Sequence, residues 1–186
     1  HARVLIDCLL LNSVKILGMT DINQKKSTFL GVPLLGNDSI IEQYSPKNIQ
    51  LINGIGSISQ PYLRRTIYEK FKDLGFSFQN VIHPSAVIAT DVNWGEGAQV
   101  MAGAVIQSGC TISDNTIVNT STSLDHECEI GAHVHLAPGV VLSGNVFIEE
   151  LCHIGIGATI MQSIRVGKGS FVKAGTIVKS DIDSSL

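Results

Sequence analysis

Several features typical of nucleic-acid-binding and membrane proteins are missing from this chain of 186 residues. It has no run of basic residues and no interleaving of basic with aromatic residues, and its formal net charge at pH 7 is -3. The composition therefore gives no indication of a nucleic-acid partner. No apolar run approaches the length needed to cross a bilayer, and no signal peptide is recognisable. We expect a cytoplasmic protein without membrane insertion.

What the chain does contain is a six-residue repeat that runs from Ile82 to Val178. Counted forward in sixes, seventeen consecutive positions hold an apolar residue, with no slip in register. They are Ile82, Ile88, Trp94, Val100, Ile106, Ile112, Val118, Leu124, Ile130, Leu136, Leu142, Ile148, Ile154, Ile160, Val166, Val172 and Val178. The residue four places after each is small or β-branched almost throughout, as at Ala104 and Cys110.

A period of six excludes an α-helix, because about 3.6 residues per turn would spread these side chains around the axis. It is typical of a parallel β-helix, in which each hexad forms one flat side and points its large and small residues inward. Three sides close a triangular coil of about 18 residues, and coils stack roughly 4.8 Å apart. Cys110 and Cys128 then lie in neighbouring coils. A disulfide between them is geometrically feasible, but we expect reduced core thiols, because no C-x-x-C pair occurs and the protein is expected to be cytosolic.

Residues 1–80 alternate between helical and extended patterns, which predicts a small, Rossmann-like α/β domain with parallel strands. We expect helices at Arg3–Leu11, Asp38–Tyr44 (capped by Asp38) and Pro61–Leu74, strands at Val14–Met19 and Ile49–Asn53, and an extended segment at Phe76–Ile82. A loop with Gly31 and Pro33 should follow the first strand. Since no strand precedes the first helix, we expect that the sequence begins after the domain's first strand.

Ligands of parallel sheets bind beyond the carboxyl ends of the strands. In this chain those ends carry Thr20 and Asp21 after one strand and the segment Gly54–Ser57 after the next. Glycines would let a ligand approach the backbone, and an aspartate can bind a sugar or ribose hydroxyl. Alternatively the glycines only make a turn, and the sequence leaves both interpretations open.

Apolar residues are also expected on the outside of the β-helix, between the two inward positions of a hexad. They are Val105, Ile117, Val141, Phe147 and Phe171. Such exposure indicates burial against other subunits. A threefold assembly matches the shape of the prism and creates three equivalent grooves, so we expect a homotrimer.

His126 is third in its hexad, which places it at a corner of the prism between Asp125 and Glu127. Gly144 occupies the same column one coil later. Acyl transfer needs a base beside a free backbone N–H, which holds the oxyanion, and either carboxylate can orient the imidazole. The alternative is a corner histidine that is merely exposed to solvent.

Other polar side chains admit further roles. His135 and His153 should stack outward on adjacent coils, where two imidazoles can bind a metal, but no third ligand has suitable spacing. We expect no metal, and His135 as a hydrogen-bond donor in a groove. The last coils are basic, through Arg165, Lys168, Lys173 and Lys179. These side chains either form a solvated surface or meet the phosphates of a long cofactor.

One stretch is more specific than the repeat. It includes Asn119-Thr120-Ser121, Leu124-Asp125-His126-Glu127-Cys128-Glu129-Ile130-Gly131, His135-Leu136-Ala137-Pro138-Gly139 and Leu142-Ser143-Gly144-Asn145-Val146. This stretch resembles the bacterial sugar acyltransferases of the sialic acid O-acetyltransferase type, which include UDP-bacillosamine and GDP-perosamine N-acetyltransferases.

The resemblance implies a left-handed β-helix, over residues 81–186, that binds acetyl-CoA between the subunits of a homotrimer. It implies that His126 is the general base and Glu127 its partner. It also implies contacts with acetyl-CoA from His135, Gly144, Ile156, Gln162 and Ala174.

For residues 1–80 the resemblance implies a domain that binds the nucleotide sugar through His1, Thr20, Asp21 and Gly56. His1-Ala2 looks like the end of the family's Gly-x-Gly-Gly-His-Ala loop, whose beginning is absent, as is the usual C-terminal Gly-x-Pro-Ala segment.

The activity expected from the resemblance is acetyl transfer from acetyl-CoA to an amino sugar, most simply a nucleotide-linked one, in bacterial surface-glycan synthesis such as that of lipopolysaccharide or capsule. O-acetylation of sialic acid or a related sugar is the alternative within this class. Outside it, the same β-helix also suits a metal-dependent hydratase, as in the γ-type carbonic anhydrases, or a non-catalytic trimeric scaffold.

Overall fold

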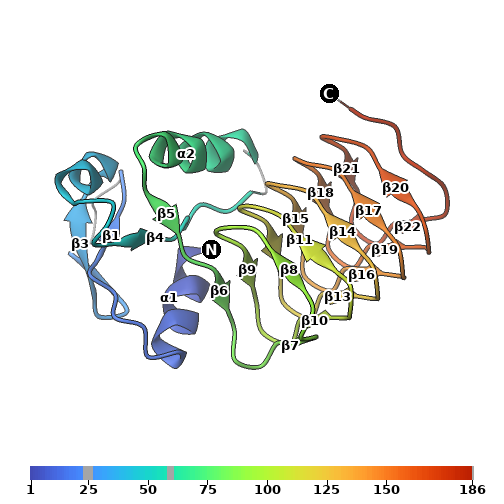
Figure 1. Ribbon diagram of the computed structural model, residues 1–186, viewed down its shortest axis with the longest axis horizontal. Coiled ribbons are helices and arrows are strands. Elements are labelled where there is room, and N and C mark those ends of the chain that lie inside the picture. The colour runs from blue at the N-terminus through green and yellow to red at the C-terminus, as the bar shows by residue number, and fades with distance from the viewer. Residues whose placement is uncertain (23–26, 58–60, 186) are drawn as a thin grey trace.

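The computed structural model describes residues 1–22, 27–57 and 61–185. Figure 1 shows a small N-terminal α/β domain beside a long prism of stacked coils, with the coils running away from the domain towards the C-terminus. Within the described residues, no helix combines the length and the apolar character that a membrane crossing requires.

The prism is a left-handed parallel β-helix whose strands form three sheets. Sheet I contains β6 (Val81–Ile82), β9 (Gln99–Val100), β12 (Ile117–Val118), β15 (His135–Leu136), β18 (His153–Ile154) and β21 (Phe171–Val172). Sheet II contains β7 (Val87–Ile88), β10 (Val105–Ile106), β13 (Ser123–Leu124), β16 (Val141–Leu142), β19 (Thr159–Ile160) and β22 (Ile177–Val178). Sheet III contains β8 (Asn93–Trp94), β11 (Thr111–Ile112), β14 (Glu129–Ile130), β17 (Phe147–Ile148) and β20 (Arg165–Val166).

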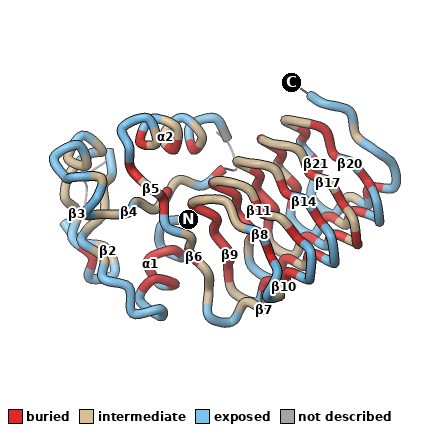
Figure 2. Tube along the Cα trace, in the orientation of Figure 1, coloured by how far each residue is buried: buried red, intermediate tan, exposed pale blue. Residues whose placement is uncertain are grey.

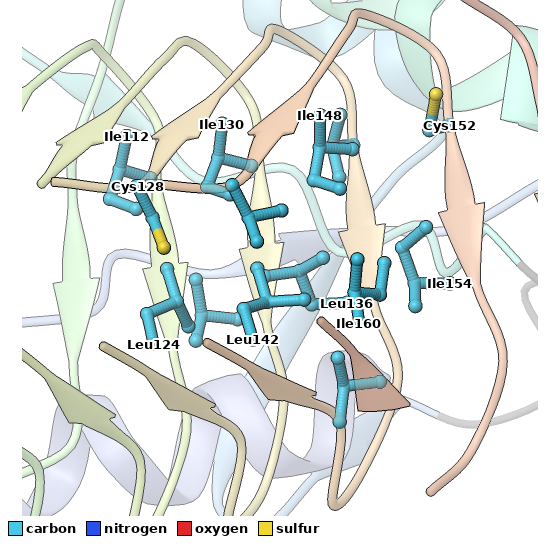
Figure 3. Packing of buried hydrophobic residues seen from close by; sticks show 14 of the residues in the cluster. Ile112, Leu124, Cys128, Ile130, Leu136, Leu142, Ile148, Cys152, Ile154 and Ile160 are labelled. Carbon is cyan, nitrogen blue, oxygen red and sulfur yellow. The ribbon is translucent and has the colours of Figure 1, made fainter. Parts of the chain in front are cut away.

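Neighbouring strands in each sheet pair in parallel with an offset of 18 residues, as in Ile117 with His135. The first residue of every hexad points into the prism, and Figure 3 shows Leu124, Leu142 and Ile160 stacked in one column inside it. Figure 2 shows this interior as a buried band that continues from coil to coil. All four cysteines are free and buried in the structure.

A turn at the fourth residue of each hexad connects one flat side to the next. In the fourteen hexads whose fourth residues run from Gly97 to Gly175, that fourth residue always has a positive φ. Half of these fourteen residues are not glycine. Left-handed backbone costs an ordinary residue roughly 1–2 kcal/mol. The geometry of the corners is therefore set by the coil, even where the residue disfavours it.

The N-terminal domain contains α1 (Ala2–Leu11), α2 (Pro61–Asp73) and the 3-10 helix η1 (Asp38–Gln43). Its strands are β1 (Met19–Thr20), β2 (Thr28–Phe29), β3 (Val32–Gly36), β4 (Gln50–Leu51) and β5 (Ser77–Phe78). β3 pairs with β1 in parallel and with β2 in antiparallel orientation, while β4 pairs in parallel with β5. The two expected strands are thus present but short, and they belong to different sheets.

Two local predictions for this domain were wrong. The loop expected around Gly31 and Pro33 is a hairpin of β2 and β3, because Leu30 and Gly31 both adopt positive φ and form its two-residue turn. The helix expected to be capped by Asp38 is capped instead by Asn37, whose side-chain oxygen accepts the amide N–H of Ser39 at 3.0 Å.

The N-terminal domain covers the early strands of sheet I. Ile117, expected on the outside, is 0% exposed. Its neighbours in the sheet, Gln99 and His135, bond to Asn53 and Ser57, which brings the segment 53–57 over this face. The expectation of an exposed Ile117 was wrong because the chain itself buries it; Val141 and Phe171 are exposed as expected.

Candidate active site

The third residues of successive hexads line the three edges of the prism. One edge, between sheets II and III, carries Ser108, His126, Gly144 and Gln162, each 18 residues after the last. We call it the His126 edge. The stack is continuous here, since the amide of Asn145 donates to the carbonyl of His126 at 2.8 Å.

His126 pairs with the carboxylate that follows it. Its Nδ1 lies 3.1 Å from Oε2 of Glu127, while its backbone N–H donates to Oδ1 of Asp125 at 2.8 Å. The side chains of His126 and Glu127 are 55% and 70% exposed. With Nδ1 directed at the carboxylate, Nε2 is the nitrogen free to accept a proton from a bound group.

Glu127 holds its position at a cost. Its φ is 59°, in the left-handed region of the backbone. Glycine and asparagine adopt this region far more readily than glutamate does. Leu151, a bulky residue in the same conformation, is buried, whereas Glu127 gains no burial. What the Glu127 side chain gains is the contact with the imidazole. The coil imposes this conformation at the other corners too, and at Glu127 it places the carboxylate beside the imidazole.

Gly144 lies directly against the imidazole. A Cβ placed on it would be 2.5 Å from Cε1 and 2.6 Å from Nε2 of His126. Among the described residues its amide N–H has no protein acceptor. The edge therefore combines an accessible imidazole nitrogen, a carboxylate on the other nitrogen and a free backbone donor, which can accept a proton and stabilise an oxyanion.

The other residues that the resemblance implies for acetyl-CoA are spread over the prism. Gln162 is exposed on the His126 edge, two coils beyond His126. Ile156 (62% exposed) and Ala174 lie on a different edge, between sheets I and II, which we call the Ile156 edge. Sheet II separates these two edges within one chain.

His135 lies on neither edge. It is 4% exposed and sits in sheet I under the N-terminal domain, with Nδ1 2.6 Å from Oγ of Ser57 and Nε2 3.1 Å from Nδ2 of Asn119. Burial, with smaller contributions from His153 and Arg64, lowers the pKa of His135 to about 3. The imidazole is therefore neutral at physiological pH.

The candidate residues of the N-terminal domain form two groups. Nε2 of His1 lies 2.6 Å from Oε1 of Gln99, and a Cβ on Gly56 would lie 3.5 Å from Cβ of His1, so these two candidates are neighbours. Thr20 ends β1 in the other sheet and Asp21 follows it; the Thr20 hydroxyl donates to Asp38 and the amide of Asp21 donates to the carbonyl of Gly36.

Sequence reasoning did not single out Arg64, which is 1% exposed in the contact between domain and prism. Its guanidinium donates to the carbonyls of Asn53 (2.9 Å), Ile55 (2.7 Å) and Asn115 (3.3 Å), and burial lowers its pKa to about 9. An arginine at helical spacing on α2 carries no signal for such contacts. Ser57 could have been noticed only as part of the glycine-containing segment.

His135 and His153 are the two histidines that the sequence suggested as possible metal ligands. Their rings stack as expected, edge to face, with centroids 4.9 Å apart. Within residues 1–22, 27–57 and 61–185, no group of three His, Cys, Asp or Glu side chains could hold a metal ion.

This fold and edge define the chain as a hexapeptide-repeat protein of the acyltransferase class. Residues 1–71 match the family model described as the PglD N-terminal domain. One similar solved structure is a histidine-to-asparagine variant of perosamine N-acetyltransferase from Caulobacter crescentus, in complex with CoA and GDP-perosamine. It is 34% identical to this chain with a TM-score of 0.93, and the alignment covers 100% of this chain and 87% of that chain. The acetyltransferase domain of PglB from Neisseria gonorrhoeae FA1090, solved with acetyl coenzyme A, is 32% identical with a TM-score of 0.91; the alignment covers 97% of this chain and 87% of that chain.

A GDP-perosamine N-acetyltransferase of Escherichia coli O157:H7 is 30% identical over 114 residues, which are 58% of this chain and 49% of that protein. The chain thus spans about half the length of this curated relative. Together with the structural matches, these similarities show that the chain belongs to the bacterial sugar acyltransferase family.

The close approach of Gly144 to the imidazole gives a first prediction. Gly144→Ala should leave the fold intact, because its φ is not positive and the group it meets is a side-chain end, but should displace the His126 ring. We expect a changed chemical shift of the His126 ring in NMR spectra and an unchanged melting temperature. Gly56→Ala, whose Cβ meets nothing within 3.4 Å, is the control. An unmoved His126 signal in Gly144→Ala would contradict the geometry.

Proposed function

We propose that the protein transfers an acetyl group from acetyl-CoA to the amino group of a nucleotide-linked sugar. The observation that carries the proposal is the His126 edge, where a base, its carboxylate partner and a free amide converge. Support for the substrates comes from the matched structures, one solved with CoA and GDP-perosamine and one with acetyl coenzyme A.

In this mechanism the sugar amine attacks the thioester carbonyl and must lose a proton as the new C–N bond forms. Nε2 of His126 takes that proton, and Glu127 at Nδ1 stabilises the imidazolium. The amide of Gly144 donates to the oxyanion of the tetrahedral intermediate. The intermediate then collapses, the C–S bond breaks, and CoA leaves as the thiol after protonation.

The choice of an amine acceptor over a hydroxyl is part of the proposal. Proton removal by His126 serves either acceptor, so the edge itself does not discriminate between them. The relatives named for amine acetylation favour the amine, and O-acetylation of a sugar is the second candidate.

The spread of the acetyl-CoA residues over two edges supports a homotrimer. Sheet II is bounded by the Ile156 edge on one side and the His126 edge on the other. If sheet II faces a threefold axis, each His126 edge approaches the Ile156 edge of a neighbouring subunit. The outward residues of sheet II are uncharged, and they are Val87, Val105, Ser123, Val141, Thr159 and Ile177. Acetyl-CoA would lie in the groove between the two edges.

The same geometry revises which basic residues face the phosphates of acetyl-CoA. Lys173 directly precedes Ala174 at the last coil of the Ile156 edge, and Lys179 lies at the last coil of the His126 edge; both are exposed. Lys168 lies on the third edge, paired with Glu150 at 2.6 Å, and Arg165 pairs with Glu149. We propose that Lys173 and Lys179, from two subunits, flank the phosphates.

We propose that the N-terminal domain comprises residues 1–80 and that the β-helix domain comprises residues 81–186. β6, the first strand of sheet I, begins at Val81, which supports this boundary. The domain would bind the nucleotide sugar through His1, Gly56, Thr20 and Asp21; the matched structure solved with GDP-perosamine supports a nucleotide sugar as the ligand.

The proposed reaction is tested with acetyl-CoA and a panel of nucleotide sugars that includes GDP-perosamine, with CoA thiol release as the signal. We expect His126→Ala to lower kcat by about 10²–10⁴-fold, the usual cost of losing a general base, and Glu127→Ala to cost less. Trimer assembly and acetyl-CoA affinity should change little. Near-normal turnover in His126→Ala would refute the assignment.

The trimer is tested by sedimentation equilibrium. We expect a stable trimer at micromolar concentration, and its dissociation when Val141→Glu places a charge on the apolar outer face of sheet II. Glu129→Lys, an exposed change on the neighbouring sheet III, serves as the control. A stable monomer in the unaltered protein would remove the groove between subunits.

The phosphate contact is tested by neutralising lysines in pairs. Lys173→Gln with Lys179→Gln should raise the KM for acetyl-CoA several-fold and leave kcat nearly unchanged, and the effect should shrink at high salt. Lys168→Gln, on the third edge, should leave that KM unchanged. The assignment fails if Lys168→Gln has the larger effect.

A further inference from the structure

His135 is built into the contact between the β-helix and the N-terminal domain. Both of its ring nitrogens have partners inside the chain: Ser57 from the domain at 2.6 Å and Asn119 from the β-helix at 3.1 Å. The ring is 4% exposed and packs edge to face on His153. No ring nitrogen is left over for a bound ligand.

The partners of Asn119 define which nitrogen carries the proton. Oδ1 of Asn119 accepts the amide N–H of Thr120 at 2.8 Å and its hydroxyl at 3.3 Å, so Nδ2 is the group that faces the ring. Nε2 of His135 therefore accepts from Asn119, and Nδ1–H donates to Oγ of Ser57. This arrangement needs a neutral imidazole, and the lowered pKa of His135, about 3, agrees with it.

The segment that Ser57 belongs to is held on sheet I at further points. Nε2 of Gln99 donates to the carbonyl of Asn53 at 2.9 Å, and Arg64 donates to the carbonyls of Ile55 and Asn115. Gly56 lies between Ile55 and Ser57 and is exposed. The hydrogen bond from His135 to Ser57 is thus an attachment of this segment on the carboxyl side of Gly56.

We infer that His135 is a positioning residue for the sugar acceptor: its Nδ1–H holds Ser57, and with it the Gly54–Ser57 segment, in place over sheet I. The inference rests on the proposed function, in which Gly56 contacts the nucleotide sugar. It departs from the resemblance, which implies a direct contact between His135 and acetyl-CoA.

Three substitutions separate these two roles. In His135→Asn the side-chain amide reaches as far as Nδ1 did, so the bond to Ser57 can be kept while the contact at Nε2 is lost. In His135→Gln the amide reaches the Nε2 position, and the bond to Ser57 is lost. Ser57→Ala removes the same bond with a minimal change. Ser85→Ala is the matched control, because Ser85 forms a 2.8 Å bond to His83 in an exposed part of the chain.

A lost buried hydrogen bond corresponds to a change on the order of ten-fold in an equilibrium. We expect Ser57→Ala and His135→Gln to raise the KM for GDP-perosamine by about that factor, with the KM for acetyl-CoA within two-fold of the unaltered protein. His135→Asn should restore the acceptor KM, and Ser85→Ala should change neither KM. A rise in the acetyl-CoA KM, above all in His135→Asn, would overturn the inference, as would unchanged values in Ser57→Ala.

A second measurement does not depend on the reaction. Amide hydrogen exchange at Gly54–Ser57 should be faster in Ser57→Ala and His135→Gln than in the unaltered protein or in Ser85→Ala. Unchanged exchange there would refute the positioning role even in an active enzyme. If the unaltered protein transfers acetyl to no nucleotide sugar while the exchange changes as expected, the proposed function fails and the attachment of the segment by His135 stands.

Discussion

The backbone ladder between coils is the interaction on which the rest of the structure depends. Each strand of two residues bonds to strands 18 residues away, so every residue of a hexad has a fixed neighbour one coil earlier and one coil later. Insertion of one residue would rotate all later side chains out of register, which is why the apolar repeat runs without a slip. The ladder also brings Gly144 against His126, two residues that have no local reason to meet.

The ladder imposes a conformation as well as a neighbour. Positive φ at the fourth residue of each hexad follows from the coil geometry, and glycine is the residue that adopts it most easily. Glu127 accepts this conformation directly after His126, so the carboxylate is fixed beside the ring at an energetic cost that the rest of the coil supports. The His126 edge is therefore held both by the coil behind it and by the contacts of His126 with Asp125 and Glu127.

The parts of the structure that could be predicted from sequence are those that repeat. Inward and outward positions, the corner place of His126 and the neighbour Gly144 all follow from counting in sixes. The burial of Ile117 and His135 does not, because it depends on where an unrelated segment, 53–57, comes to lie. Likewise the turn at Leu30 and Gly31 was missed because Pro33 suggested a loop, and a single positive φ at a leucine has no sequence signal.

The three outer faces of the prism differ in what covers them and in their charge. The proposed reaction depends on these differences. Sheet I carries the chain's own N-terminal domain, through polar contacts such as those of Gln99 and His135. Sheet II is uncharged on its outer face and lies between the two edges with candidate ligand contacts, whereas Glu129 and Arg165 make sheet III a solvated face. The early strands of sheet I are covered and sheet III carries charges, so sheet II is the uncharged face that the proposed self-association would use. In that proposed association the His126 edge would meet the Ile156 edge of a neighbouring subunit, where further candidate acyl-donor contacts lie, so the proposed reaction requires assembly.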